Sequence, residues 1–150
     1  MLIGIDPLLG PELLAVLRAM GHGDEIAIVD ANFPAAATAR RLIRADGLPL
    51  TRMLGAILGV LPLDRSDEAA FTMQVIGDAT AVPDAVADIC RLVAAAGDTR
   101  PVGTLERHAF YARAAGCFAI VATGETRLYG NVILRKGVVE APGLSDGDDA

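Results

Sequence analysis

Few side chains in this sequence could move a proton near neutral pH. Its two histidines are His22 and His108, and histidine is the residue whose unperturbed side chain titrates between pH 5 and 8. His22 lies in a short polar link after a predicted helix, and Asp30 ends the strand that is predicted to follow. A histidine and a carboxylate that meet at a bound substrate can act as general acid and base. His22 and Asp30 are therefore candidate catalytic residues.

A second group of polar residues could hold a ligand. Arg107 lies near the start of a predicted helix, and the Tyr129-Gly130-Asn131 turn precedes the last predicted strand. Ligands of parallel α/β sheets bind outside the carboxyl ends of the strands, where we expect Asp30, Arg107 and this turn. Each also has an ordinary interpretation: His22 or Asp30 as a cap, Arg107 as a solvated or ion-paired side chain, and the turn as turn chemistry alone. The residues by themselves leave both interpretations open.

Motifs for other chemistries are absent from the sequence. It contains no Walker A motif, no G-x-G-x-x-G and no G-x-S-x-G elbow. Its two cysteines, Cys90 and Cys117, are far apart and lie among apolar or small residues, so we interpret them as small core side chains. Two histidines and two separated cysteines do not make a zinc site. We expect neither a metal nor a cofactor.

Composition limits the class of partner. The chain has 150 residues, a formal net charge of -6 and a single lysine, Lys136. Nucleic acid binding needs clustered lysines and arginines, so we expect no nucleic acid partner and favour a neutral polar ligand. Hydrophobic residues make up 53% of the chain and charged residues 21%. These shares predict an extensive core, or an apolar surface that is hidden in a homo-oligomer.

The N-terminus and the apolar runs predict no association with a membrane. Met1 to Asp6 contain no basic segment followed by an apolar stretch, so we expect no signal peptide. No uninterrupted apolar run approaches the roughly 18 residues that are needed to span a bilayer. A cytoplasmic protein is therefore predicted.

Apolar periodicity predicts helices that alternate with strands. Helices are expected near 11–20, 50–61, 83–97 and 106–115, strands over 25–30, 42–45, 71–75, 118–123 and 131–135, and a loop with a short helix over 31–41. This order predicts an α/β fold, in which a largely parallel or mixed sheet carries helices on both faces. We expect one domain over residues 1–139, followed by an acidic, glycine-rich and flexible tail over 140–150.

Strings of residues along most of the chain resemble the L-fucose mutarotase family. They are Gly21-His22-Gly23-Asp24-Glu25-Ile26, Asp30-Ala31-Asn32-Phe33-Pro34, Ile43-Arg44-Ala45-Asp46-Gly47-Leu48, Glu106-Arg107 with Phe110-Tyr111, Ala122-Thr123-Gly124-Glu125-Thr126, and Tyr129-Gly130-Asn131 with Leu134-Arg135-Lys136-Gly137-Val138. The strings keep the family's order and spacing from about Met1 to Val138. The resemblance implies an isomerase with a ribose pyranase-like fold. Such an enzyme interconverts the α and β anomers of free L-fucose, or a similar deoxyhexose, by general acid–base ring opening and closure.

The resemblance also implies roles for individual residues. His22 would be the proton donor, Asp30 would bind sugar hydroxyls and share the proton transfer, and Arg107 would bind hydroxyls. The Tyr129-Gly130-Asn131 turn would contact the anomeric or ring oxygen, with Tyr129 among the catalytic groups and the glycine leaving room for the sugar. Relatives form rings or larger homo-oligomers with sites near subunit boundaries, and they need no metal or cofactor.

Two other functions stay open on the sequence. D-ribose pyranases share the fold, but they typically have Gly-His-Thr-Asp, a histidine and Tyr-Ala-Asn where this chain has Gly21-His22-Gly23-Asp24, Arg107 and Tyr129-Gly130-Asn131. All three places favour the fucose enzymes. A non-catalytic sugar-binding oligomer is the third hypothesis, which His22 disfavours because a binding protein needs no titratable group. His108 stands where an aromatic residue is expected.

Overall fold

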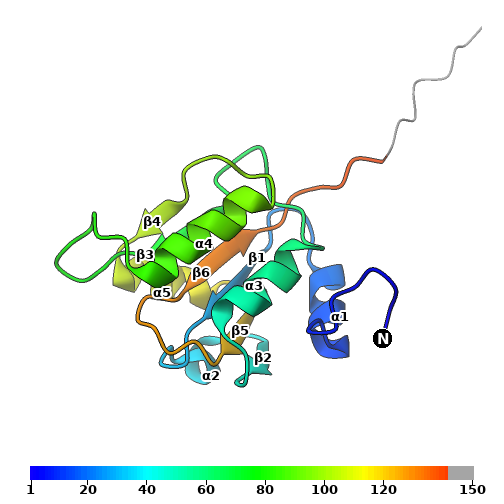
Figure 1. Ribbon diagram of the computed structural model, residues 1–150, viewed down its shortest axis with the longest axis horizontal. Helices are drawn as coiled ribbons and strands as arrows, with labels where there is room; N and C mark the ends of the chain where they lie inside the picture. Colours follow the sequence, from blue (N-terminus) through cyan, green and yellow to red (C-terminus); the bar gives the residue numbers. More distant parts are fainter. Residues whose placement is uncertain (142–150) are drawn as a thin grey trace, which may run out of the picture.

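A six-stranded sheet forms the centre of the molecule in the computed structural model, which describes residues 1–141 (Figure 1). From one edge to the other, the strands are β2 (Leu42–Ala45), β5 (Ala119–Thr123), β1 (Glu25–Val29), β6 (Val132–Arg135), β3 (Ala70–Met73) and β4 (Gly103–Leu105). Neighbouring strands pair in parallel, except that β6 runs antiparallel to both β1 and β3. The sheet is therefore mixed and largely parallel, as predicted.

Helices cover both faces of this sheet (Figure 1). One face carries α1 (Pro11–Ala19), α3 (Leu50–Leu58) and α4 (Asp84–Ala95), and the other carries α2 (Ala35–Thr38) and α5 (Arg107–Ala115). None of these helices is long and apolar enough to cross a membrane, a statement that covers residues 1–141. The predicted α/β fold class is confirmed.

Burial on both faces explains why the central strand β1 is apolar at successive positions. Ile26 and Ile28 belong to the core under α1, α3 and α4, whereas Ala27 and Val29 belong to the core under α2 and α5. Successive side chains of a strand point to opposite faces of the sheet. A strand buried on both faces therefore needs apolar residues at every position.

Local sequence also sets where the helices begin. In α3, Leu50, Met53, Leu54 and Ile57 are all buried, and they recur at the spacing that places them on one helical face. The helix α5 begins at Arg107 because the Glu106 carboxylate accepts hydrogen bonds from the backbone amides of residues 108 and 109. Such a side-chain cap satisfies amides that lack partners inside the helix. The cap fixes where Arg107 leaves the backbone.

The structure departs from the predicted elements in a few places. The edge strand β4 was not predicted, because three residues are too few to show an alternating pattern. Helix α3 ends at Leu58, whereas Leu61 continues the apolar pattern and is buried outside the helix. Most of the predicted tail over 140–150 lies outside the described residues, so its flexibility stays a prediction.

The antiparallel direction of β6 determines which residues lie beside the carboxyl end of β1. It begins beside the carboxyl end of β1, where Val132 pairs with Ile28, and it ends beside the start of β1, where Arg135 pairs with Glu25. The residues just before β6 therefore lie beside Asp30, which directly follows β1. Residues just before β1, including His22, lie at the opposite edge of the sheet.

Candidate active site

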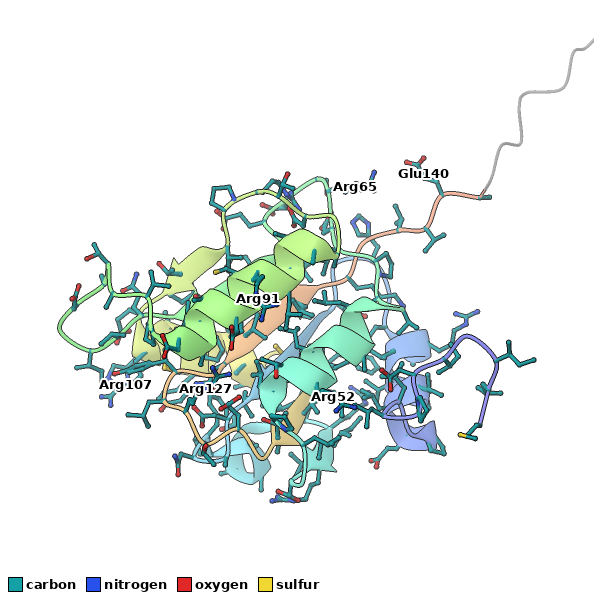
Figure 2. The ribbon with its side chains drawn as sticks, viewed as in Figure 1. Arg52, Arg65, Arg91, Arg107, Arg127 and Glu140 are labelled. Carbon is teal, nitrogen blue, oxygen red and sulfur yellow. The ribbon has the colours of Figure 1, made fainter. Side chains whose placement is uncertain are left out.

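A pocket of about 180 Å³ lies at the carboxyl end of β1. Four of the predicted site residues line it, namely Asp30, Arg107, Tyr129 and Asn131, together with Asn32, Phe33, Met73, Ile76, Tyr111 and Leu128. Figure 2 places Arg107 and Arg127 at this end of the molecule, and Arg65 and Glu140 at the other end. The fold thus brings together residues that are up to 101 positions apart in sequence.

Asp30 and Asn131 hold each other at the base of this pocket. The Asp30 backbone amide donates to Asn131 Oδ1 over 2.9 Å, and Asn131 Nδ2 donates to Asp30 Oδ2 over 3.1 Å. The other oxygen of Asp30 accepts from the Asn32 backbone amide over 3.0 Å. Both residues are buried. The carboxylate is therefore held in one orientation before any ligand arrives.

Burial changes the proton affinity of this carboxylate. It raises the pKa of Asp30 above its usual value, and the hydrogen bonds from Asn32 and Asn131 only partly oppose that effect. Removing a carboxylate from water disfavours its charged form. A carboxylate with a raised pKa is a better proton acceptor than an exposed one, which suits a group that must take up and return a proton.

Arg107 brings a positive charge to the pocket without a carboxylate partner. No Asp or Glu within residues 1–141 forms an ion pair with it. Its Nη2 atom lies 3.5 Å from Nε2 of His108, which does not line the pocket. The guanidinium donors are therefore available to hydroxyl oxygens of a ligand.

Tyr129 reaches the pocket from a constrained backbone conformation. Its φ angle is 63°, which makes it the one residue other than glycine with positive φ within residues 1–141. Such a conformation costs free energy in a bulky residue and persists only where the surroundings impose it. The Tyr129 hydroxyl accepts a hydrogen bond from the backbone amide of Ile76 over 3.2 Å. The backbone and the ring of Tyr129 are therefore both fixed by neighbouring residues.

The structure gives Gly130 a packing role. A Cβ atom at this position would lie 2.7 Å from Cγ of Glu125, and Gly130 is buried without lining the pocket. Glycine is therefore needed here because the Glu125 side chain occupies the space that a larger residue would fill. The predicted role of Gly130 in leaving room for the sugar stays a prediction.

His22 lies far from the pocket within the same chain. It precedes β1 and Asp30 follows it, so the length of the strand, roughly 13 Å, separates the two. The imidazole is 52% exposed, and its Nε2 atom lies 3.4 Å from Oδ2 of buried Asp64. The predicted pairing of His22 with Asp30 therefore does not occur inside one copy of the chain.

Asp64 is held as a carboxylate beside that histidine. Its Oδ1 atom accepts from the backbone amide and the hydroxyl of Ser66, over 2.9 and 2.7 Å. These hydrogen bonds hold the pKa of Asp64 well below its usual range. Its Oδ2 atom lies 3.0 Å from Arg135 Nε and has no hydrogen bond within the described part of the chain. The Oδ2 atom that pairs with Arg135 thus also faces His22.

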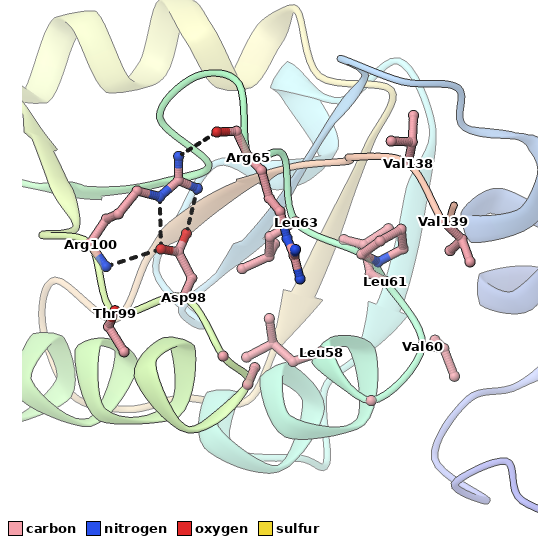
Figure 3. Close-up of a pocket in the computed structure, with 14 residues that line it drawn as sticks. Leu58, Val60, Leu61, Leu63, Arg65, Asp98, Thr99, Arg100, Val138 and Val139 are labelled. Carbon is pink, nitrogen blue, oxygen red and sulfur yellow. Dashed lines mark hydrogen bonds and ion pairs between the residues drawn. The ribbon is translucent and has the colours of Figure 1, made fainter. Parts of the chain in front are cut away.

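A larger cavity, of about 530 Å³, lies near the His22 edge of the sheet. Figure 3 shows Asp98 and Arg100 on one side of it, Leu61, Val60 and Val139 on the other, and the Arg65 side chain between them. The Arg100 guanidinium there is occupied by Asp98 and by the carbonyl oxygens of residues 64, 65 and 67. The smaller pocket combines a buried carboxylate with an arginine that has no ion pair within residues 1–141, and it is the better candidate for chemistry.

Two residues that the structure adds to the candidate site, Tyr111 and Asp64, were not predicted as site residues. Tyr111 lines the pocket from α5 and packs its ring 5.3 Å from that of Phe33. It stands one helical turn after Arg107, which was a signal that the two could share a face. Asp64 is distant in sequence from His22, and nothing in its local pattern marks it as buried.

Comparison with known proteins gives a consistent result for this chain. Residues 3–139 match the model of the RbsD / FucU transport protein family. Fucose mutarotase of Homo sapiens is 47% identical over 146 residues, which cover 91% of this chain and 93% of that protein. Fucose mutarotase of Danio rerio is 44% identical over 145 residues, with the same two coverages.

A solved structure is similar over the same length. It is the fucose mutarotase of Streptococcus pneumoniae in complex with L-fucose, which is 40% identical in sequence. The two structures superpose with a TM-score of 0.86, and the match covers 93% of this chain and all of the other. The similarity therefore extends over almost the whole of this chain.

Proposed function

Because this chain belongs to the RbsD / FucU transport protein family, we propose that it is a sugar isomerase that interconverts the α and β anomers of free L-fucose. The observation that carries this function is the identity of 47% to a fucose mutarotase over 91% of the chain. A relative of similar fold is in complex with L-fucose. The similarity to fucose mutarotases confirms the mutarotase function that the sequence predicts. The roles of individual residues are our proposal.

The reaction needs two proton transfers and no redox change. A base removes the proton of the anomeric hydroxyl while an acid donates a proton to the ring oxygen, and the bond between C1 and that oxygen breaks. The open aldehyde rotates about the C1–C2 bond. The ring oxygen then attacks the other face of the carbonyl, and both protons return. Positioned acid–base groups typically contribute about 10²–10⁴-fold to such a step.

The pocket residues suit the binding part of this reaction. Arg107 and the Asp30 carboxylate bind sugar hydroxyls, because one supplies fixed donors and the other fixed acceptors. The raised pKa of Asp30 lets it share the proton transfer. Tyr129 and Asn131 face the anomeric or ring oxygen, and Tyr111 adds an aromatic wall. These five residues bind and orient the sugar, and the proton donor must come from another residue.

The acid in this proposal is His22 of a second copy of the chain. His22 cannot reach the pocket of its own copy, because β1 lies between them. It is half exposed, and it can therefore enter a neighbouring site. Asp64 faces Nε2 of the ring, so the ring is oriented by a buried carboxylate and Nδ1 is left to meet the sugar.

Exposed apolar residues support an assembly of this kind. Ile76 and Leu128, at the mouth of the pocket, are 62% and 66% exposed. At the opposite edge, Val60, Val138 and Val139 are exposed beside the larger cavity (Figure 3). Contact between these two surfaces on adjacent copies covers apolar area on both and brings His22 toward a pocket. A ring or other homo-oligomer is therefore part of the proposal.

The test of the function is magnetisation exchange between the anomeric protons of a free sugar. We expect the protein to accelerate α/β exchange of L-fucose, and to change that of D-ribose little. Acceleration of D-ribose exchange alone would assign the chain to the ribose pyranase reaction. No acceleration for either sugar, from folded and assembled protein, would leave a sugar-binding oligomer as the better function.

A further inference from the structure

The loop between β5 and β6 contains an ion-pair cluster that the reaction does not use. Arg127 donates from its backbone amide and from Nε to Glu125 Oε1, both over 3.0 Å, and from Nη2 to Oε2 over 3.2 Å. Its Nη1 atom donates to Asp88 Oδ2 of α4 over 2.8 Å. The Glu125 side chain is 4% exposed. Such a two-sided guanidinium contact has a well-defined geometry.

The same cluster contacts the residues that follow Tyr129 and Asp30. Glu125 Cγ occupies the space where a side chain at position 130 would lie, directly after Tyr129. The Glu125 carbonyl accepts from the Ala31 backbone amide over 2.9 Å, next to Asp30. The Tyr129 carbonyl accepts from the Asn131 amide over 2.8 Å. Glu125 therefore joins the loop to the residue after Tyr129 and to the residue after Asp30, and the turn at Tyr129 is closed by its own hydrogen bond.

We propose that Glu125 and Arg127 are positioning residues for Tyr129, and that Asp88 fixes this pair to α4. Tyr129 has a φ angle in the left-handed region. A tyrosine keeps this backbone conformation only where the surrounding loop is held in place. The fork between Glu125 and Arg127 closes the loop, and the contact with Asp88 anchors it to a helix of the core. The catalytic part of this inference rests on the proposed mutarotase function.

The charges of the cluster agree with this role. Hydrogen bonds from Arg127 hold the pKa values of Glu125 and Asp88 below their usual range. The pair therefore stays ionised, and it keeps its geometry, across the range in which a histidine titrates. The contacts that position Tyr129 therefore do not change over the pH range in which the proposed acid and base titrate.

The test uses variants that break the cluster at different points. Glu125→Gln keeps the shape beside Gly130 and removes the charge, and Arg127→Met removes the fork. Arg127→Lys keeps a positive charge but cannot contact Glu125 and Asp88 together. Arg91→Met is the matched control, because Arg91 binds Asp88 Oδ1 over 3.2 Å on the exposed side and does not touch the loop.

Tyrosine-labelled NMR reads the position of Tyr129 directly. The chain has two tyrosines, Tyr111 and Tyr129, and both line the pocket. We expect Glu125→Gln and Arg127→Met to shift the Tyr129 ring signals and leave those of Tyr111 in place. Misplacement of a reacting group by about 1 Å can lower a rate by about 10²-fold. We therefore expect kcat for fucose exchange to fall by roughly ten- to a hundredfold in both variants. Arg127→Lys should restore part of it, and Arg91→Met should behave as the parent.

Two outcomes would overturn the proposal. The first is folded variants whose Tyr129 signals match the parent. The second is a lowered Tm with unchanged kcat, which indicates a purely structural cluster. If the parent itself accelerates no fucose exchange, the proposed function fails, and the ring signals still decide whether the cluster positions Tyr129.

Discussion

Replacing His22 by alanine is expected to lower kcat for L-fucose anomer exchange by about 10²–10⁴-fold, the usual contribution of a positioned acid–base group. The imidazole is half exposed and forms no part of either core, so the variant should fold as the parent does. The pocket that we propose binds the sugar lies at the other end of β1 and should be unchanged. L-Fucose should therefore still bind, and KM should change little.

The control for this variant is His108→Ala. His108 is exposed, and its side chain contacts Arg107 without lining the pocket. Its loss can alter KM through Arg107, but it should leave kcat near that of the parent. Equal acceleration by His22→Ala and the parent would show that His22 is not the acid.

Replacing Asp30 by asparagine is expected to lower kcat/KM by about 10²-fold, because the variant loses a proton acceptor and a charged partner for sugar hydroxyls. The two oxygens of Asp30 accept from the Asn32 amide and from Asn131 Nδ2. An asparagine must turn its own NH₂ group toward one of these donors. The orientation of Asn131 should therefore be disturbed as well, which adds to the loss.

Asp46→Asn is the matched control for Asp30→Asn. Asp46 follows β2 at the same edge of the sheet, but it pairs with Arg44 in solvent and lies outside the pocket. Its replacement should leave fucose exchange unchanged. Activity and Tm are measured on both variants, so that a loss of folding is separated from a loss of chemistry. Parent-like kcat/KM in folded Asp30→Asn would remove Asp30 from the mechanism.

Most of the fold could be predicted because its elements have strong apolar patterns. β1 is apolar at successive positions since it is buried on both faces, and α3 has four buried residues on one side. The edge strand β4 could not be predicted, because it is only three residues long and partly exposed. The predicted end of α3 was wrong because Leu61, which lies after the helix, is also buried in the core and continues the apolar pattern.

The pocket was predictable from the same topology, whereas the place of His22 was not. Asp30 and the turn at Tyr129 both adjoin strand ends, and the antiparallel pairing of β6 with β1 brings them together. His22 and Asp30 are close in sequence but distant in space, because the extended strand β1 lies between them. Asp64 was missed because its partners, His22 and Arg135, come from distant segments.

The central claim is that His22 of one copy acts in the Asp30 pocket of another. Its most direct test combines the two inactive variants, His22→Ala and Asp30→Asn, by co-expression or joint refolding. If each site joins a pocket from one copy with a histidine from the next, roughly a quarter of the sites in an equal mixture have both groups intact. We predict that the mixture regains about that share of the parent's fucose exchange rate. A mixture no more active than its two components, in an assembly shown to contain both chains, would contradict the account.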